Sequence, residues 1–317
     1  MLEALGLFLI GLFLLALGGD SIVKGAAGLA RRSGMSPFAA GLVLVGFGTS
    51  LPELAVNARA LLAGQPALAL GNAVGSNVAN IGLTLGAAAL AAPLLVRWRA
   101  LSPLLAVLIL ATLAVIALGF DGALSRVDGM LLLAAFVAVL AFALARAREE
   151  HPEVRGALGA VLETSSAPLQ NALRIIVAIA LLYFGARWVV AGAPVIGAAL
   201  GMEPVLTGLL VVAIGTALPE MAAAVVAARR GQGDMVLGHV VGSSLFNLLV
   251  VLGGMALVHP VAIPASFVRF ELPAALAFAL LLVPLLRGDL RIGRAEGGVL
   301  LLAFVAWVAF ELLLMRA

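Results

Sequence analysis

The sequence lacks cysteine and has few charged side chains, and these two absences exclude most soluble functions. Without cysteine, the chain of 317 residues can form no disulfide, thiolate metal site, iron–sulfur cluster or cysteine nucleophile. Only 11% of its residues are charged and 64% are hydrophobic, whereas soluble domains have about 25% and about 45–50%. A soluble globule of this composition would expose large apolar patches and aggregate. The composition therefore predicts a polytopic membrane protein and excludes a soluble enzyme, a nucleic-acid binder and a disordered chain.

Ten apolar stretches are long enough to cross a bilayer as helices, which takes about 20 residues each. A β-barrel would need alternating polar and apolar residues, and residues 131–144 show no such alternation. The first stretch lacks the basic start of a cleaved signal peptide, since Glu3 is its only early charge. The sequence therefore predicts an all-α fold with spans near 3–30, 37–62, 67–91, 101–120, 128–146, 169–200, 204–228, 235–258, 267–286 and 295–315.

The basic residues indicate how the spans are oriented. The pI near 10.5 reflects a net charge of only +3, from 19 Lys and Arg against 16 Asp and Glu. When the connecting loops are numbered in chain order, fourteen basic residues fall at the odd-numbered loops and four on the other face. Since cytoplasmic loops carry an excess of Lys and Arg, the odd loops are predicted to be cytoplasmic. Both termini then lie on the extracytoplasmic side of the cell (inner) membrane.

The chain also contains an internal repeat. Residues 34–86 align without a gap with residues 201–253, at an offset of 167 residues, and 23 of the 53 positions are identical, which indicates a duplication. The two copies are five spans apart, so they cross the membrane in opposite directions. Inverted repeats are typical of secondary transporters, which bind their substrate at the repeat interface. We expect a first five-helix repeat over 1–146, a short cytoplasmic loop over 147–168 and a second repeat over 169–317.

Each copy places one glutamate deep inside a span, in the motif Gly-Thr-x-Leu-Pro-Glu. The two glutamates are Glu53 and Glu220. A carboxylate at mid-bilayer costs about 2.5–3.5 kcal/mol on insertion scales, so a matched pair indicates a function. The preceding prolines, Pro52 and Pro219, lack an N–H and free the carbonyl oxygen four residues earlier. Such a helix break is tolerated in a membrane where the backbone lines a cavity or is buried in protein.

The neighbouring polar residues offer further oxygen ligands. Thr49 and Thr216 lie four residues before the glutamates and share a helix face with them. The next span of each copy carries a serine and an asparagine four apart, namely Ser76 with Asn80 and Ser243 with Asn247. Two carboxylates with hydroxyl, amide and carbonyl oxygens suit a hard cation, Ca²⁺ or Na⁺. Protons are expected to compete with the cation for two close carboxylates.

This paired pattern resembles the two α-repeats of the sodium/calcium exchanger family in the cation/calcium antiporter superfamily, as in its prokaryotic members. The resemblance implies a secondary antiporter that exchanges Ca²⁺ for Na⁺ by alternating access, with no covalent chemistry, no cofactor and no obligate protein partner. It implies that the first and sixth spans are gating helices, which here carry Asp20, Lys24 and Arg187. The ligand set that it implies is Glu53, Glu220, Thr49, Thr216, Ser50, Ser76, Ser243, Asn80 and Asn247, with the backbone carbonyls of Gly46 and Ala213.

Three positions depart from the family pattern. Ala217 replaces a serine, which removes one hydroxyl ligand and leaves the sodium stoichiometry open. His239 and Ser244 replace asparagines and are expected outside the immediate ligand set. Asn247 stands where potassium-dependent exchangers, and some prokaryotic sodium/calcium exchangers, carry an acid, which argues against potassium dependence.

Three other functions compete with sodium/calcium exchange. Proton/calcium antiport on the same scaffold is the nearest, because of the lost hydroxyl at Ala217. An ion channel would show flux without coupling to a counter-ion. An intramembrane protease would need two aspartates, a His-Glu-x-x-His motif or a base beside a serine, and the sequence argues against each.

Overall fold

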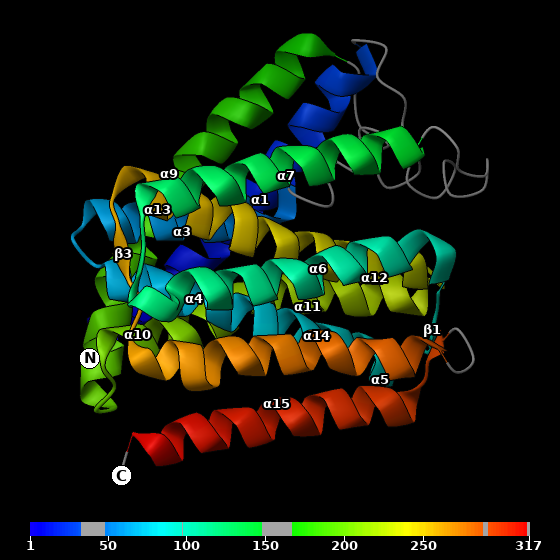
Figure 1. The fold of residues 1–317 in the computed structure, drawn as a ribbon. Coiled ribbons are helices and arrows are strands. Elements are labelled where there is room, and N and C mark those ends of the chain that lie inside the picture. Colours follow the sequence, from blue (N-terminus) through cyan, green and yellow to red (C-terminus); the bar gives the residue numbers. More distant parts are fainter. Residues whose placement is uncertain (33–47, 97, 148–166, 288–290, 316–317) are drawn as a thin grey trace.

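The computed structural model describes residues 1–32, 48–96, 98–147, 167–287 and 291–315, which form a bundle of long helices (Figure 1). The α-helices are α1 (Leu2–Arg32), α3 (Leu51–Leu62), α4 (Pro66–Ala79), α5 (Gly86–Ala91), α6 (Trp98–Leu118), α7 (Arg126–Ala147), α9 (Pro168–Ala199), α10 (Pro204–Leu206), α11 (Ala213–Arg229), α12 (Gly233–Phe246), α13 (Leu252–Val258), α14 (Leu272–Arg287) and α15 (Arg294–Leu314). Two short 3₁₀ segments are η1 (Gly48–Ser50) and η3 (Gly119–Asp121), and four π-helical segments are η2 (Asn80–Leu85), η4 (Thr207–Val212), η5 (Asn247–Val251) and η6 (Phe267–Glu271).

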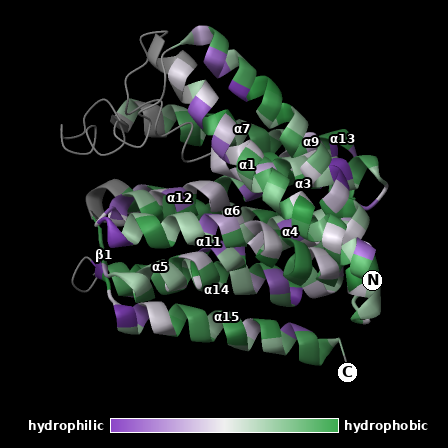
Figure 2. Ribbon diagram, turned by 180° about the vertical axis from the view of Figure 1, so that it is seen from behind, coloured by the Kyte–Doolittle hydropathy of each residue, from purple (hydrophilic) through white to green (hydrophobic). Residues whose placement is uncertain are grey.

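Most of the predicted spans are found as helices of the expected length. Eight helical stretches of the described chain are long and apolar enough to cross a membrane, and they match eight of the predicted spans. The span expected near 128–146 corresponds to α7, which has 22 residues. The span expected near 37–62 lies partly outside the described residues, and its second half forms α3. Figure 2 shows that most residues along the helices are hydrophobic. The protein is a polytopic helical membrane protein.

The two most buried spans lie in the middle of the bundle. Of 18 consecutive residues within Pro66–Ala91, 83% are buried, and within Gly233–Val258 the share is 78%. In the other six candidate spans, the corresponding share is 28–50%. Burial of this extent lets these two spans carry polar side chains, because they face protein instead of lipid. They hold both serine–asparagine pairs of the repeats.

The fold is not purely helical, because four loops form two short antiparallel strand pairs. Strand β1 (Leu94–Leu95) pairs with β4 (Arg291–Ile292), and β2 (Ala123–Leu124) pairs with β3 (Val261–Ala262). Each pair joins a loop of the first half of the chain to a loop of the second half. Figure 1 shows β1 at one end of the bundle, and β3 at the opposite end together with both termini. Strands of two residues were not predicted, since they are too short to give an alternating pattern.

The longest helices, α1 and α9, pack against each other in antiparallel directions. They have 31 and 32 residues. Gly11 of α1 faces the backbone of Gly185, and Gly192 faces the backbone of Ala4. A side chain at Gly11 would place its Cβ 2.9 Å from the carbonyl oxygen of Gly185. Glycines at these positions therefore bring the two backbones close together, as small residues do in membrane helix pairs.

A second close contact joins α4 to the segment that precedes α11. The backbone of Gly71 faces the carbonyl oxygen of Val205, and that of Gly75 faces the carbonyl oxygen of Leu209. Reciprocally, Gly208 faces the carbonyl oxygen of Leu68. This contact joins α4, in the first half of the chain, to residues 205–209 in the second half.

We expect Gly71→Ala to destabilise the protein, because the added Cβ would collide with the backbone oxygen of Val205. The free energy of unfolding should fall by about 1–3 kcal/mol, the usual cost of overpacking. The matched control is Gly238→Ala, at the equivalent position of the second repeat, where a Cβ would have nothing within 4 Å. Thermal unfolding of the purified protein in detergent measures both. Equal shifts of the two midpoints would contradict the packing described.

Candidate cation site

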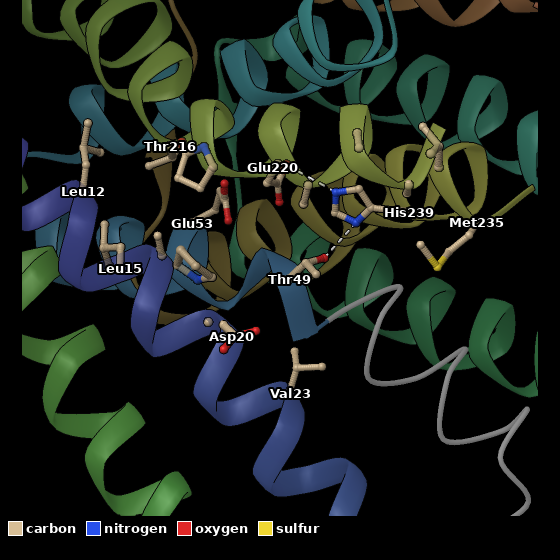
Figure 3. Close-up of a pocket in the computed structure, with 18 residues that line it drawn as sticks. Leu12, Leu15, Asp20, Val23, Thr49, Glu53, Thr216, Glu220, Met235 and His239 are labelled. Atoms are coloured by element: carbon tan, nitrogen blue, oxygen red, sulfur yellow. Dashed lines mark hydrogen bonds and ion pairs between the residues drawn. The ribbon is translucent and has the colours of Figure 1, made fainter. Parts of the chain in front are cut away.

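A cavity of about 320 Å³ lies between α1, α3, α11 and α12 (Figure 3). Most of its wall is apolar, contributed by residues such as Leu12, Leu15 and Ala224. The polar part of the wall comes from both sequence repeats and from α1. Its polar side chains are Asp20, Thr49, Glu53, Thr216, Glu220 and His239.

The two predicted glutamates meet in this cavity. Glu53 is 2% exposed and Glu220 is 9% exposed. The Glu53 carboxylate lies close enough to Glu220 for electrostatic interaction, and Thr216 lies beside it. Oε2 of Glu53 and both carboxylate oxygens of Glu220 have no hydrogen-bond partner among the described residues. Burying a carboxylate costs several kcal/mol, and a bound proton, an opposite charge or a hydrogen-bond partner offsets this cost. The pair is therefore suited to hold a cation.

The proline of each motif shapes the backbone next to the carboxylate, but the two copies differ in detail. Pro52 lies in the first turn of α3, directly after the 3₁₀ segment η1, so Glu53 lies at a helix N-terminus, where a negative charge is favoured. Pro219 lies inside α11, which follows the π-helical segment η4. Thr216 Oγ1 donates to the carbonyl oxygens of Val212 and Ala213, both at 3.2 Å. The second carboxylate is therefore held in a continuous helix.

Three polar side chains outside the cavity lining form a hydrogen-bonded network. Ser50 Oγ donates to Ser243 Oγ at 2.8 Å, and Asn80 Nδ2 donates to the same oxygen at 3.0 Å. All three side chains are buried. This network joins η1 and η2 of the first repeat to α12 of the second.

The equivalent network of the opposite orientation is not formed. It would join position 217 to Ser76, with Asn247 donating to the same serine, but residue 217 is an alanine that is 1% exposed. In the part of the chain that the structure describes, Ser76 Oγ and both amide atoms of Asn247 lack hydrogen-bond partners. Ala217 therefore offers no hydroxyl to Ser76, and the two repeats differ in their buried hydrogen bonds.

Both asparagines begin π-helical segments. Asn80 is the first residue of η2, and Asn247 is the first residue of η5. They are 1% and 0% exposed, and they occupy equivalent positions of the two repeats. A π-helical turn inserts extra backbone into a helix and is frequent at functional sites.

The structure locates most of the predicted ligands. Four of them line the cavity, namely Thr49, Glu53, Thr216 and Glu220. The side chains of Ser50, Ser76, Ser243, Asn80 and Asn247 and the residue Ala213 are buried outside the cavity lining. Gly46 lies outside the described residues. Within those ranges, no three Asp, Glu or His side chains are grouped closely enough to hold a metal ion by themselves. A bound cation would therefore also need hydroxyl, amide or backbone oxygens.

Comparison with known proteins identifies the family. The family model described as sodium/calcium exchanger protein matches residues 3–145 and again residues 171–313. The chain belongs to this exchanger family. It is 34% identical over 318 residues to the inner membrane protein YrbG of Escherichia coli, covering 98% of this chain and 97% of that protein. It is 28% identical over 340 residues to the sodium/calcium exchanger MaX1 of Methanosarcina acetivorans, covering 95% and 96%.

The fold of this exchanger is similar to that of a solved relative. The structure of the sodium-calcium exchanger NCX_Mj, soaked with Na⁺ and Sr²⁺, matches with a TM-score of 0.69 and 30% identity. The match covers 97% of this chain and 98% of that one. The similarity therefore extends over both halves of the chain.

His239 lies in the cavity, against two predicted ligands. Its predicted place outside the immediate ligand set stays a prediction. Nδ1 lies 3.0 Å from Thr49 Oγ1, and Nε2 lies 3.7 Å from Glu220 Oε2 (Figure 3). The sequence contained one signal, because His239 stands where the first repeat has Asn72. Which way the side chain turns depends on its neighbours, and the sequence alone does not give them.

The charged residues of α1 and α9 form no common cluster in the described structure. Asp20 and Lys24 form a salt bridge with 2.7 Å between Oδ2 and Nζ, because residues four apart lie on the same helix face. Both side chains are more than half exposed, and Asp20 also lines the mouth of the cavity. Arg187 is exposed on α9. A gating role for these residues stays a prediction.

We expect Ser243→Ala to destabilise this exchanger, because Ser50 and Asn80 would each lose an acceptor in a buried site. The loss should be about 1–3 kcal/mol, the cost of leaving a buried polar group unsatisfied. The matched control is Ser244→Ala, whose buried hydroxyl has no hydrogen-bond partner among the described residues. Thermal unfolding in detergent compares the two. A control as damaged as Ser243→Ala would refute the importance of this network.

Proposed function

We propose that this protein is an antiporter that exchanges Ca²⁺ for Na⁺ across the cell membrane by alternating access. The observation that carries the proposal is the pair of buried carboxylates, Glu53 and Glu220, at equivalent positions of two repeats and in one cavity. Two carboxylates cancel the charge of one Ca²⁺. Hydroxyl, amide and carbonyl oxygens complete the ligand chemistry that Ca²⁺ and Na⁺ prefer.

The proposed ligand set is the one predicted from the sequence. Glu53 and Glu220 are the central ligands of either ion, and Thr49 and Thr216 add oxygens beside them. The sodium sites next to the centre use Ser50, Ser76 and Ser243, while Asn80 and Asn247 line the middle. The hydrogen-bonded network around Ser243 supports this arrangement, because it holds serine and asparagine oxygens of both repeats together. The backbone carbonyls of Gly46 and Ala213 complete the proposed set.

We further propose ten spans in two inverted repeats, over 1–146 and 169–317, with 147–168 as the connecting loop. The double match of one family model supports the duplication. The strand pairs support the topology, because β1 and β4 both lie in odd-numbered loops while β2 and β3 both lie in even-numbered ones. An inverted repeat exchanges the two pairs, since a shift of 167 residues relates β1 to β3 and β2 to β4 within one residue. Both termini lie at the even-loop end (Figure 1).

Two features support alternating access. The cavity extends from the carboxylates toward Asp20, Ala227 and Met235, which lie near the odd-loop end of their helices. This is the end that the basic residues assign to the cytoplasm. The lining also includes α1, which packs along α9 with close contacts at its glycines, such as Gly11 against the backbone of Gly185. Movement of this pair would close the cavity on one side and open it on the other.

The main test is ⁴⁵Ca²⁺ uptake into proteoliposomes loaded with Na⁺ and diluted into Na⁺-free buffer. We expect uptake in the wild type and uptake at the level of protein-free liposomes in Glu53→Gln and Glu220→Gln, because each change removes a charge that balances Ca²⁺. The matched control is Glu311→Gln, which neutralises a buried carboxylate of α15 outside the cavity and should retain uptake. Full uptake in both cavity variants would overturn the site.

The same vesicles decide which ion is coupled. The buried Ala217 removes a sodium ligand and favours the competing function, proton/calcium antiport. We expect a Na⁺ gradient without a pH gradient to drive Ca²⁺ uptake, and a pH gradient alone to leave it at background. The reverse result would assign proton coupling. Uptake without either gradient would indicate a channel.

The topology is tested by cysteine labelling, for which the chain offers no background because it has no native cysteine. Cysteine introduced at Glu203, in an even loop, should react with a membrane-impermeant maleimide in intact cells. Cysteine introduced at Arg230, in an odd loop, should react only after the membrane is permeabilised. Both native side chains are exposed, so the label can reach either site. Labelling in the opposite order would show that the proposed orientation is inverted.

A further inference from the structure

The first repeat has no histidine at the position equivalent to His239, and the neighbours of His239 explain why its ring enters the cavity. In the first repeat the equivalent residue is Asn72, whose Nδ2 donates to Asn57 Oδ1 at 3.1 Å. The residue equivalent to Asn57 in the second repeat is Ala224, whose methyl group accepts no hydrogen bond. The imidazole at 239 therefore cannot repeat the contact within its own copy, and it lies against the first repeat's Thr49 instead.

The two ring nitrogens of His239 face different groups. Nδ1 lies 3.0 Å from Thr49 Oγ1, a hydrogen-bonding distance, whereas Nε2 lies 3.7 Å from Glu220 Oε2, which is too long for a hydrogen bond. If Nδ1 carries the proton and donates it to Thr49, Nε2, the ring nitrogen near Glu220, keeps its lone pair. Histidines that ligate metals are oriented in this way, with the second ring nitrogen donating to a neighbouring acceptor.

The space between Nε2 and the carboxylate suits a small divalent cation. Metal–nitrogen and metal–oxygen bonds of about 2.1 Å to the two atoms would meet at an angle of roughly 120°. Neither carboxylate oxygen of Glu220 has a hydrogen-bond partner among the described residues, so both are available as ligands. Glu53 and Thr216 line the same cavity and lie beyond Glu220 as seen from His239 (Figure 3).

We propose that His239 is a specificity-determining residue, whose Nε2 and the Glu220 carboxylate together bind a divalent transition-metal ion such as Mn²⁺ or Zn²⁺ in the transport cavity. Ca²⁺ takes oxygen ligands, whereas imidazole nitrogen is a preferred ligand of the transition metals. A site with one nitrogen therefore extends the range of cations toward Mn²⁺ and Zn²⁺. Transport of these metal ions rests on the proposed exchange function, whereas their binding by His239 and Glu220 does not.

The first test is direct and does not depend on transport. Mn²⁺ is bound to the full-length protein in detergent, and pulsed electron paramagnetic resonance detects whether a ¹⁴N nucleus is coordinated. We expect ¹⁴N modulation in the wild type, its loss in His239→Asn, and its retention in His259→Asn. His259 is an exposed histidine outside the cavity, hydrogen-bonded to the Pro260 carbonyl. Wild-type protein without ¹⁴N modulation, or modulation that survives His239→Asn, would overturn the proposal.

The second test measures selectivity. In the proteoliposome assay, Mn²⁺ should inhibit ⁴⁵Ca²⁺ uptake. His239→Asn should raise the ratio of the Mn²⁺ inhibition constant to the Ca²⁺ KM by about tenfold or more, because loss of even a residue that only orients a metal ligand weakens metal binding by about 10–100-fold. An unchanged ratio would refute the selectivity role. A wild type that binds Mn²⁺ through ¹⁴N but takes up no Ca²⁺ under either gradient would refute the exchange function and leave the metal site standing.

Discussion

Two carboxylates lie close together inside an apolar bundle, and the rest of the structure is arranged around that constraint. Glu53 and Glu220 are almost fully buried and carry oxygens without hydrogen bonds among the described residues. Like charges at short range repel each other, and burial removes the water that would screen them. The cavity wall is otherwise mostly apolar. A bound cation or proton lowers the energy of this arrangement, so occupancy of the site contributes to its stability.

The helices that surround the pair are adapted to hold polar groups in the middle of a membrane. The two most buried spans carry the serines and asparagines, and they approach the second half of the chain closely because glycines such as Gly71 and Gly75 face backbone oxygens. The α1–α9 pair uses the same device at Gly11 and Gly185. Small residues let the backbones approach closely, which increases the van der Waals contact between the helices.

Apolar runs and the repeat sufficed to predict most of the fold and the glutamate pair. Span lengths follow from hydrophobicity, and Glu53 and Glu220 are conspicuous because a charge inside a span is costly. The π-helical segments at Asn80 and Asn247 could not be predicted, since a π turn has no hydrophobic period of its own. The orientation of His239 could not be predicted, because it depends on its neighbours in the fold. Ala224 stands at the position of Asn57, so the contact between Asn57 and Asn72 has no equivalent in the second repeat.

The differences between the repeats are as informative as their similarity. The serine at 50 donates to Ser243, while Ala217 offers nothing to Ser76, so the two sides of the site are chemically unequal. The carboxylates themselves keep their equivalent places in the cavity. The central claim is that they hold the transported cation, and anomalous diffraction from crystals soaked with Sr²⁺ tests it most directly. We predict an anomalous peak between the carboxylates of Glu53 and Glu220, and density only at exposed acidic residues would contradict the account.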